Sequence, residues 1–134
     1  MSGAHILHFK QIPVVSRGGG IDTRPLVGAK QGSKGISNGV TSFPPGAAIP
    51  LHTHNAEESV TVIEGEAVAE VEGKFETLHP YDTTFVPAGV QHRFINRSQG
   101  IMSILWVYGS THVTRTFVET GETVDQLSEE DRVG

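Results

Sequence analysis

Two histidines separated by one residue, followed by two adjacent acids, are the residues whose spacing most clearly allows chemistry. These are His52 and His54, with Glu57 and Glu58 shortly after them. In a β-strand, residues i and i+2 point to the same face, so an extended backbone would aim both imidazoles at one point. The two imidazoles, a carboxylate from Glu58 and a third imidazole from elsewhere would suit a divalent metal ion. The spacing therefore indicates a candidate metal site.

Composition limits what kind of site this can be. The chain has 134 residues, a formal net charge of −5 and no cysteine. Its length is that of one domain with its own core. The lack of cysteine excludes disulfide frameworks, thiolate zinc sites and iron–sulfur clusters, so any metal must be bound by His, Asp, Glu or backbone oxygens. The acidic charge without a long basic run predicts that nucleic acid is not a partner.

The N-terminal segment has no basic stretch followed by a long apolar stretch, as a secretory signal peptide would have. No apolar run approaches the roughly 18 residues that a membrane span requires. The sequence therefore predicts a cytoplasmic protein without a membrane partner.

Short β-rich runs separated by glycine and proline are the elements that must position the histidines. The 16 glycines and 7 prolines are spread along the chain, a pattern typical of an all-β barrel or sandwich. One predicted strand runs through His52 and His54. The other predicted strands cover residues 12–15, 26–29, 36–43, 58–63, 67–72, 75–78, 83–86, 91–96, 101–108 and 112–118.

The organisation that follows is a single domain over residues 1–134. We expect an N-terminal arm with edge strands over residues 1–35, a barrel over residues 36–118 and a tail over residues 119–134. In the tail, Thr123 and Gln126 have the spacing of a capping box, which predicts one short helical turn or a frayed end.

Two stretches of the chain together resemble the two signature motifs of the cupin superfamily. The first has a glycine, the two histidines, the acid and a closing glycine at the family's spacing: Gly46, His52, His54, Glu58 and Gly65. The second has Pro87, Gly89, His92 and Asn96. It departs from the family pattern where Tyr81 stands in place of the opening glycine, a change that we expect to alter a turn rather than the metal site.

The resemblance implies a jelly-roll barrel, also called a double-stranded β-helix, with a divalent metal ion inside. The implied protein ligands are His52, His54, Glu58 and His92. The spacing selects Glu58 as the ligand, and strand alternation then turns Glu57 away. The same alternation predicts that Val60 and Val62 face inward with Glu58, and that Phe94 faces inward with His92.

Imidazole and carboxylate ligands suit Fe(II), Mn(II), Co(II), Ni(II), Cu(II) or Zn(II). Four protein ligands on such an ion leave open positions for water or substrate, as in catalytic metal sites. We favour Fe(II) and a dioxygenase-type oxidoreductase acting on a small molecule. With Mn(II), Ni(II) or Zn(II), Lewis-acid chemistry of an isomerase, decarboxylase or lyase is the alternative. A non-catalytic module that binds a small ligand is a third possibility.

Proton transfer would need a further group near the metal, and Tyr108 and Glu57 are the two candidates. Tyr108 lies with Trp106 on the most apolar predicted strand, where core packing is the competing interpretation. Arg24 and Arg115 could reach an acidic substrate, but no sequence feature places them.

The predicted strand at residues 12–15 indicates the oligomeric state. An exposed strand edge tends to pair with another chain unless it is covered. We therefore expect a homodimer in which this strand joins the partner's sheet.

Overall fold

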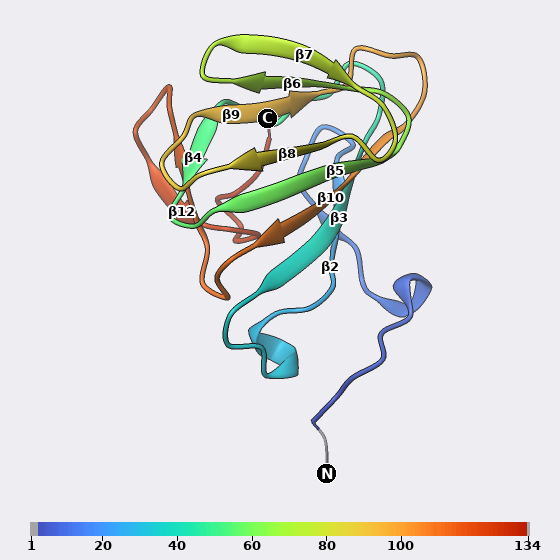
Figure 1. The fold of residues 1–134 in the computed structure, drawn as a ribbon, viewed down its shortest axis with the longest axis vertical. Coiled ribbons are helices and arrows are strands. Elements are labelled where there is room, and N and C mark those ends of the chain that lie inside the picture. Colours follow the sequence, from blue (N-terminus) through green and yellow to red (C-terminus); the bar gives the residue numbers. More distant parts are fainter. Residues whose placement is uncertain (1–2, 134) are drawn as a thin grey trace.

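Twelve β-strands in two antiparallel sheets form the fold of residues 3–133, which a computed structural model describes (Figure 1). The first sheet has the order β1-β2-β3-β10-β5-β8, and the second has the order β12-β11-β4-β9-β6-β7. The expected all-β jelly roll is thus confirmed. The strands are β1 Val15–Ser16, β2 Asp22–Pro25, β3 Ser37–Phe43, β4 His52–His54, β5 Glu58–Glu64, β6 Ala67–Val71, β7 Lys74–Leu78, β8 Thr83–Val86, β9 His92–Ile95, β10 Met102–Tyr108, β11 Thr114–Phe117 and β12 Thr123–Asp125.

Strand β10 is the centre of the first sheet. It pairs with β3 from Met102↔Phe43 to Tyr108↔Ser37 and with β5 on its other side. The register with β5 places Tyr108 opposite Glu58, at the start of β5. The most apolar strand of the sequence therefore carries Tyr108 to the acid of the first motif.

The core lies between the two sheets and receives side chains from both. The first sheet contributes Val60, Val62 and Ile104, and the second contributes Ala69 and Phe94. Val60 is 1% exposed and Val62 is fully buried, which confirms the predicted inward face of β5. Removing these apolar surfaces from water is the main force that holds the two sheets together.

Two turns show why the motifs need glycine at fixed positions. Gly65 has φ +73°, and a Cβ there would collide with the backbone oxygen of Ile101. Tyr81, where the family pattern has glycine, also has a left-handed φ of +74°, while its side chain is 82% exposed. The departure from the motif thus lies in a turn at the surface, away from the histidines, as expected.

Residues 26–29 do not form the predicted strand. β2 ends at Pro25, and a 3-10 helix, η2, covers Ala29–Gln31. The backbone N–H of Val27 donates to Oδ1 of Asn38, and the Gln31 side chain accepts from the N–H of Gly28. These side-chain bonds bend the chain at the point where a strand would continue. A second 3-10 helix, η1, covers Phe9–Gln11.

The C-terminal segment is a strand and an ordered loop in place of the expected helical turn. Thr123–Asp125 pairs with β11, where Thr116 and Thr123 share a hydrogen bond of 2.8 Å between their hydroxyls. Val124 is buried, so β-branched residues and burial favour the strand over the capping-box pattern. Leu127 and Val133 then pack against the core.

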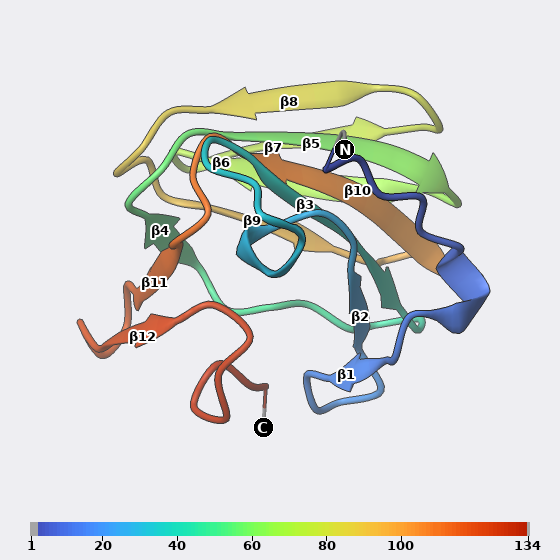
Figure 2. The ribbon, with the colours of Figure 1, turned by 90° about the horizontal axis from the view of Figure 1, so that it is seen from below.

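The C-terminal segment lies against the loop that follows β1. The N–H of Val133 donates to the carbonyl oxygen of Arg17 at 2.6 Å. Figure 2 shows the C-terminal segment beside β1 and β2. No helix in residues 3–133 is long and apolar enough to cross a membrane.

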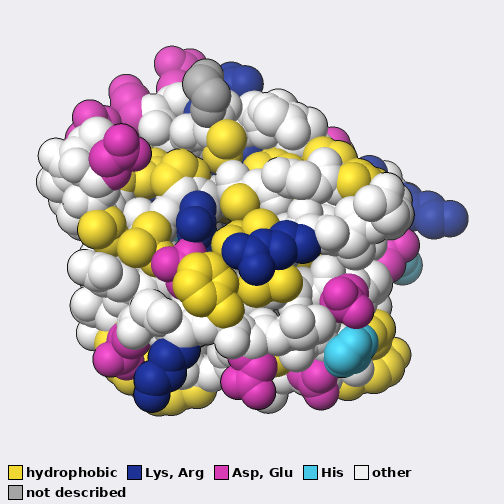
Figure 3. Space-filling view, turned by 90° about the horizontal axis from the view of Figure 1, so that it is seen from above, with side chains coloured by type: hydrophobic (Ala, Val, Ile, Leu, Met, Phe, Trp, Pro, Cys, Tyr) yellow, Lys and Arg dark blue, Asp and Glu magenta, His cyan; other side chains and the backbone are white. Residues whose placement is uncertain are grey.

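The edge strand β7 is exposed along most of its length. On it, Phe75 is 52% exposed and lies under the guanidinium of Arg97, which is 5.3 Å from the ring centroid. Figure 3 shows the face above this strand, where hydrophobic side chains are interspersed with acidic and basic ones. Charged Lys74 and Glu76 on β7 disfavour pairing of this edge with another sheet.

Candidate metal centre

Three buried imidazoles converge inside the barrel. His52 and His54 lie on β4, with the half-buried Thr53 between them pointing away, and His52 pairs in register with His92 of β9. The ring centroids are 4.5 to 5.2 Å apart, and one ligand atom of each ring lies within 4.8 Å of the others. The structure thus contains a histidine cluster that could hold a metal ion.

The backbone fixes the orientation of all three rings. Nδ1 of His52 lies 2.6 Å from the Pro50 carbonyl oxygen, and Nδ1 of His54 lies 2.9 Å from that of Thr114. Nδ1 of His92 lies 2.9 Å from the carbonyl oxygen of Val90. Because a carbonyl oxygen only accepts, each Nδ1 must donate, so Nε2 is the atom of each ring that could act as a ligand.

Burial also sets the protonation of the two histidines on β4. It lowers the pKa of His52 well below the usual 6.5, and the positive charge of Arg115 lowers it further. Burial likewise lowers the pKa of His54 to about 4, although the nearby Glu58 carboxylate opposes the shift. Both rings are therefore neutral at pH 7, the state in which imidazole binds a metal.

Glu58 completes the cluster. Its Oε1 lies 2.9 Å from Nε2 of His92 and 3.8 Å from Nε2 of His54. Burial by itself would raise the pKa of Glu58, but the hydrogen bond with His92 and the electrostatic effect of the neighbouring His54 and His92 hold it below its usual value. Ligand atoms at neighbouring positions of an ion with bonds of about 2.1 Å lie roughly 3 Å apart. The Glu58–His92 pair has this separation, and the three histidines lie close enough to one another to hold a divalent cation with it.

Tyr108 lies at this centre, whereas Glu57 does not. The Tyr108 hydroxyl is 3.1 Å from Nε2 of His54, and the side chain also hydrogen-bonds to Glu58. Burial and the Glu58 charge raise the pKa of Tyr108 well above 10, so the phenol keeps its proton at neutral pH. The Glu57 side chain is exposed and lies near Gly109, on the opposite face of the strand.

A cavity of about 30 Å³ borders the histidines. Its walls include His52, Glu58, Phe94, Trp106 and Arg115. Phe94 therefore faces inward with His92, as the alternation of β9 predicted. A cavity of this size has room for water but not for an organic substrate.

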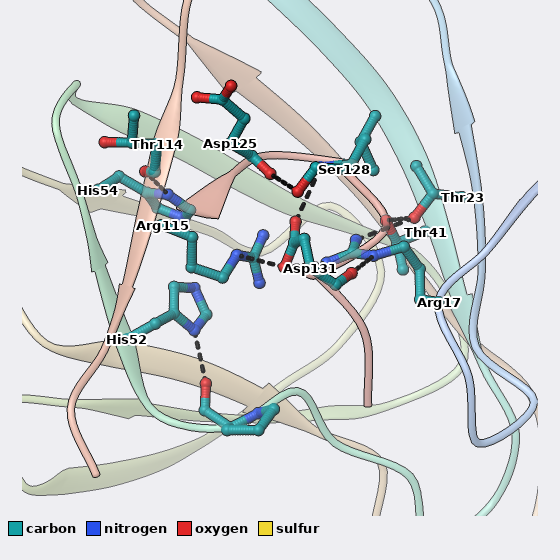
Figure 4. A network of polar contacts seen from close by, with 12 residues as sticks. Arg17, Thr23, Thr41, His52, His54, Thr114, Arg115, Asp125, Ser128 and Asp131 are labelled. Carbon is teal, nitrogen blue, oxygen red and sulfur yellow. Dashed lines mark hydrogen bonds and ion pairs between the residues drawn. The ribbon is translucent and has the colours of Figure 1, made fainter. Parts of the chain in front are cut away.

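Three charged residues at the cavity form a network that sequence reasoning did not find. Asp131, which is 1% exposed, has Oδ1 at 3.0 Å from Nη2 of Arg17 and 3.2 Å from Nε of Arg115. Figure 4 shows Arg115 between His52 and Asp131. Arg24, the other arginine considered, lies instead over the ring of Phe9, 4.6 Å from its centroid.

The sequence pattern could have indicated the buried position of Arg115, but not those of Arg17 and Asp131. Arg115 shares the face of Val113 on an alternating strand, and a charged residue on an apolar face indicates a buried role. Arg17 and Asp131 are 114 residues apart and belong to loops, where no periodicity indicates which way a side chain points.

The family model for the cupin domain matches residues 39–108, which include all four candidate ligands. The chain belongs to the cupin family. No curated protein matches this chain.

Solved structures with the same fold come from several bacteria. An RmlC-like cupin from Shewanella frigidimarina is 22% identical, with a TM-score of 0.71 over 80% of this chain and 91% of its own. A cupin-superfamily sugar phosphate isomerase from Silicibacter pomeroyi is 21% identical, with a TM-score of 0.72 over 97% and 100% of the two chains. The polyketide cyclase RemF from Streptomyces resistomycificus is 19% identical, with a TM-score of 0.72 over 96% and 89%. At these identities the likeness establishes the shared fold alone.

Proposed function

We propose that this cupin is an enzyme that binds one divalent transition metal ion and acts on a small molecule. The proposed ligands are His52, His54, Glu58 and His92. The observation that carries the proposal is the convergence of three buried imidazoles, two of them neutral at pH 7, with the buried Glu58 carboxylate. The bound ion would supply Lewis acidity and, as Fe(II), redox chemistry with O2.

The first candidate reaction is dioxygenase-type oxidation with Fe(II). Its support is the ligand set, which leaves coordination positions for a substrate, and the apolar wall formed by Phe43, Phe94 and Ile104. These apolar side chains limit the access of water to the centre, which strengthens the electrostatic interactions inside.

The second candidate is a Lewis-acid reaction of an isomerase, decarboxylase or lyase. Tyr108 favours it, because a phenol that stays protonated at neutral pH beside the ligands can donate a proton to a developing anion. In this role Tyr108 acts as a general acid and Glu58 remains a carboxylate.

The test begins with metal content measured by elemental analysis of the wild type and the His92→Ala variant. We expect a first-row metal in the wild type and loss of most of it in the variant. His79→Ala is the matched control, since the His79 side chain is 63% exposed. Equal metal content in wild type and His92→Ala would contradict the site assignment.

The reaction class is then tested with metal-reconstituted protein. Oxygen uptake by the Fe(II) form with a panel of diols, diketones and thiols would support the dioxygenase. Turnover with Mn(II) or Zn(II) but no oxygen uptake would support the Lewis-acid reaction instead. Full metal loading without turnover in any form would indicate a non-catalytic binding module.

We also propose a homodimer in the cytoplasm. β1 is an edge of the first sheet, and Val14 before it is 46% exposed, so this edge is available for a partner chain. Light scattering distinguishes the dimer from a monomer.

A further inference from the structure

We propose that the ligand of this centre carries a carboxylate, which binds Arg115 beside the histidines in exchange for the carboxylate of Asp131. The inference rests on the proposed function, because it names the substrate class of the same site. In the structure, Asp131 of the C-terminal segment holds the position that the ligand would take.

Arg115 is placed to bind an anion inside the barrel. Its residue is 3% exposed, it pairs in register with His54, and it lines the same cavity as His52. Nε is engaged by Asp131, but the buried Nη1 has no hydrogen-bond partner among residues 3–133. A buried donor without an acceptor is costly, so this atom favours a ligand that brings an acceptor.

The charges of the cluster favour an anion. Arg17 and Arg115 each carry a positive charge, and among residues 3–133 the carboxylate that forms ion pairs with them is that of Asp131. Glu58 is committed to the proposed metal ion. Two arginines that share one carboxylate thus leave a positive charge in excess next to the cavity. A planar guanidinium matches a carboxylate with two parallel hydrogen bonds, so a carboxylate fits better than a monodentate anion.

Asp131 carries a carboxylate, the same group as the proposed ligand that would displace it. Its Oδ1 contacts both arginines, and its Oδ2 accepts the N–H of Leu127 at 2.8 Å. Leu127 has φ +65°, a left-handed conformation that is strained for leucine, so the turn depends on this contact. Exchange of one carboxylate for another would keep the arginines neutralised while the turn is released.

The small size of the cavity explains why Asp131 would have to be displaced when the ligand binds. At about 30 Å³ it cannot admit an organic substrate, and Gln126 of the C-terminal segment forms part of its wall. Displacing the Asp131 carboxylate would remove the ion pair that ties this segment to Arg115 and would enlarge the cavity at the position of Arg115. Arg17 remains in place through its hydrogen bond to the Thr23 hydroxyl.

The experiment uses Trp106, the single tryptophan of the chain, because it lines the cavity. Acetate and formate are titrated into the Zn(II)-loaded and the chelator-treated protein, with acetamide and formamide as neutral isosteres, and Trp106 fluorescence and the melting temperature are followed. We expect both carboxylates, but neither amide, to bind. Arg115→Gln should weaken this binding roughly 10- to 100-fold, since a hydrogen bond to a charged group is lost. Arg24→Gln, which removes the same charge outside the cavity, should change nothing.

Asp131→Asn gives a second test that does not depend on the Arg115 variant folding. With the competing carboxylate removed, acetate should bind more tightly and raise the melting temperature more than in the wild type. The proposal is overturned if acetate and acetamide act equally on Asp131→Asn, or if Arg115→Gln keeps the wild-type affinity for acetate. Because the chelator-treated protein is included, failure of the metal assignment would appear in the His92→Ala metal content and not in these titrations.

Discussion

The metal-free protein should lose stability in mild acid. This loss should begin at pH values well above those at which its carboxylates titrate. Burial lowers the pKa of His54 from 6.5 to about 4, and it lowers the pKa of His52 in the same direction. At pH values between the pKa of His54 in the unfolded chain, 6.5, and its pKa in the folded chain, about 4, the unfolded chain binds more protons than the folded chain. The contribution of the neutral histidine to stability is therefore fully present above its pKa in the unfolded chain. It falls as the pH drops towards its pKa in the folded chain.

The magnitude follows from the shift of His54. A difference of about 2.5 pKa units corresponds to about 3 kcal/mol over the whole window, and about 2 kcal/mol of this falls between about pH 7.5 and about pH 5. His52 adds to the loss, because its pKa shift has the same sign. The lowered pKa of Glu58 adds a further loss only below its usual value of 4.5. Losses of this size are a large part of the stability of a small domain.

The assay is urea denaturation of the chelator-treated protein at several pH values, with the free energy of unfolding extrapolated to water. His54→Gln should flatten the pH dependence, because the titrating ring is gone. His112→Gln, at a side chain that is 76% exposed, is the matched control and should keep the wild-type slope. A free energy of unfolding that stays constant from about pH 7.5 to about pH 5 would refute the reasoning.

Two further substitutions test how the fold positions the site. Gly39→Ala should lower the free energy of unfolding by about 1–3 kcal/mol, because the new methyl group collides with the Trp106 ring and comes within 2.9 Å of the Arg24 carbonyl oxygen. Gly28→Ala meets only an ordinary contact at 3.7 Å, so an equal loss in both variants would contradict this explanation. Tyr81→Gly should raise stability by up to about 1 kcal/mol, because glycine adopts the left-handed φ of this turn without strain. Tyr81→Ala should give no such gain in thermal melting, and a gain there would point to the loss of the side chain instead.

The barrel and the convergence of the histidines could be predicted from the sequence because both rest on periodicity and fixed spacing. Alternation places His52 and His54 on one face of β4, and the same rule separates Glu58 from Glu57. His92 required the second motif, since a cross-strand partner about forty residues away has no local signature. The role of Asn96 is also clear only in the structure, where its amide donates to the carbonyl oxygens of Phe43 and Gly100.

Local propensity failed where tertiary contacts decide the conformation. The capping-box pattern at Thr123 predicted a helical turn, but pairing with β11 and the burial of Val124 stabilise β12 instead. The acidic run that includes Asp131 has the composition of a solvated tail. Two buried arginines draw Asp131 into the interior, and neither arginine is near it in sequence.

The proposed metal ligands and the charged residues at the cavity lie in different parts of the chain. The family model ends at Tyr108, and every proposed metal ligand lies inside it, whereas Arg17, Arg115 and Asp131 all lie outside. Substituting one of these three leaves the metal ligands in place and changes the charge that faces the cavity. The segments that carry these three residues lie side by side, since the N–H of Val133 donates to the carbonyl oxygen of Arg17 and the C-terminal segment lies beside β1 (Figure 2).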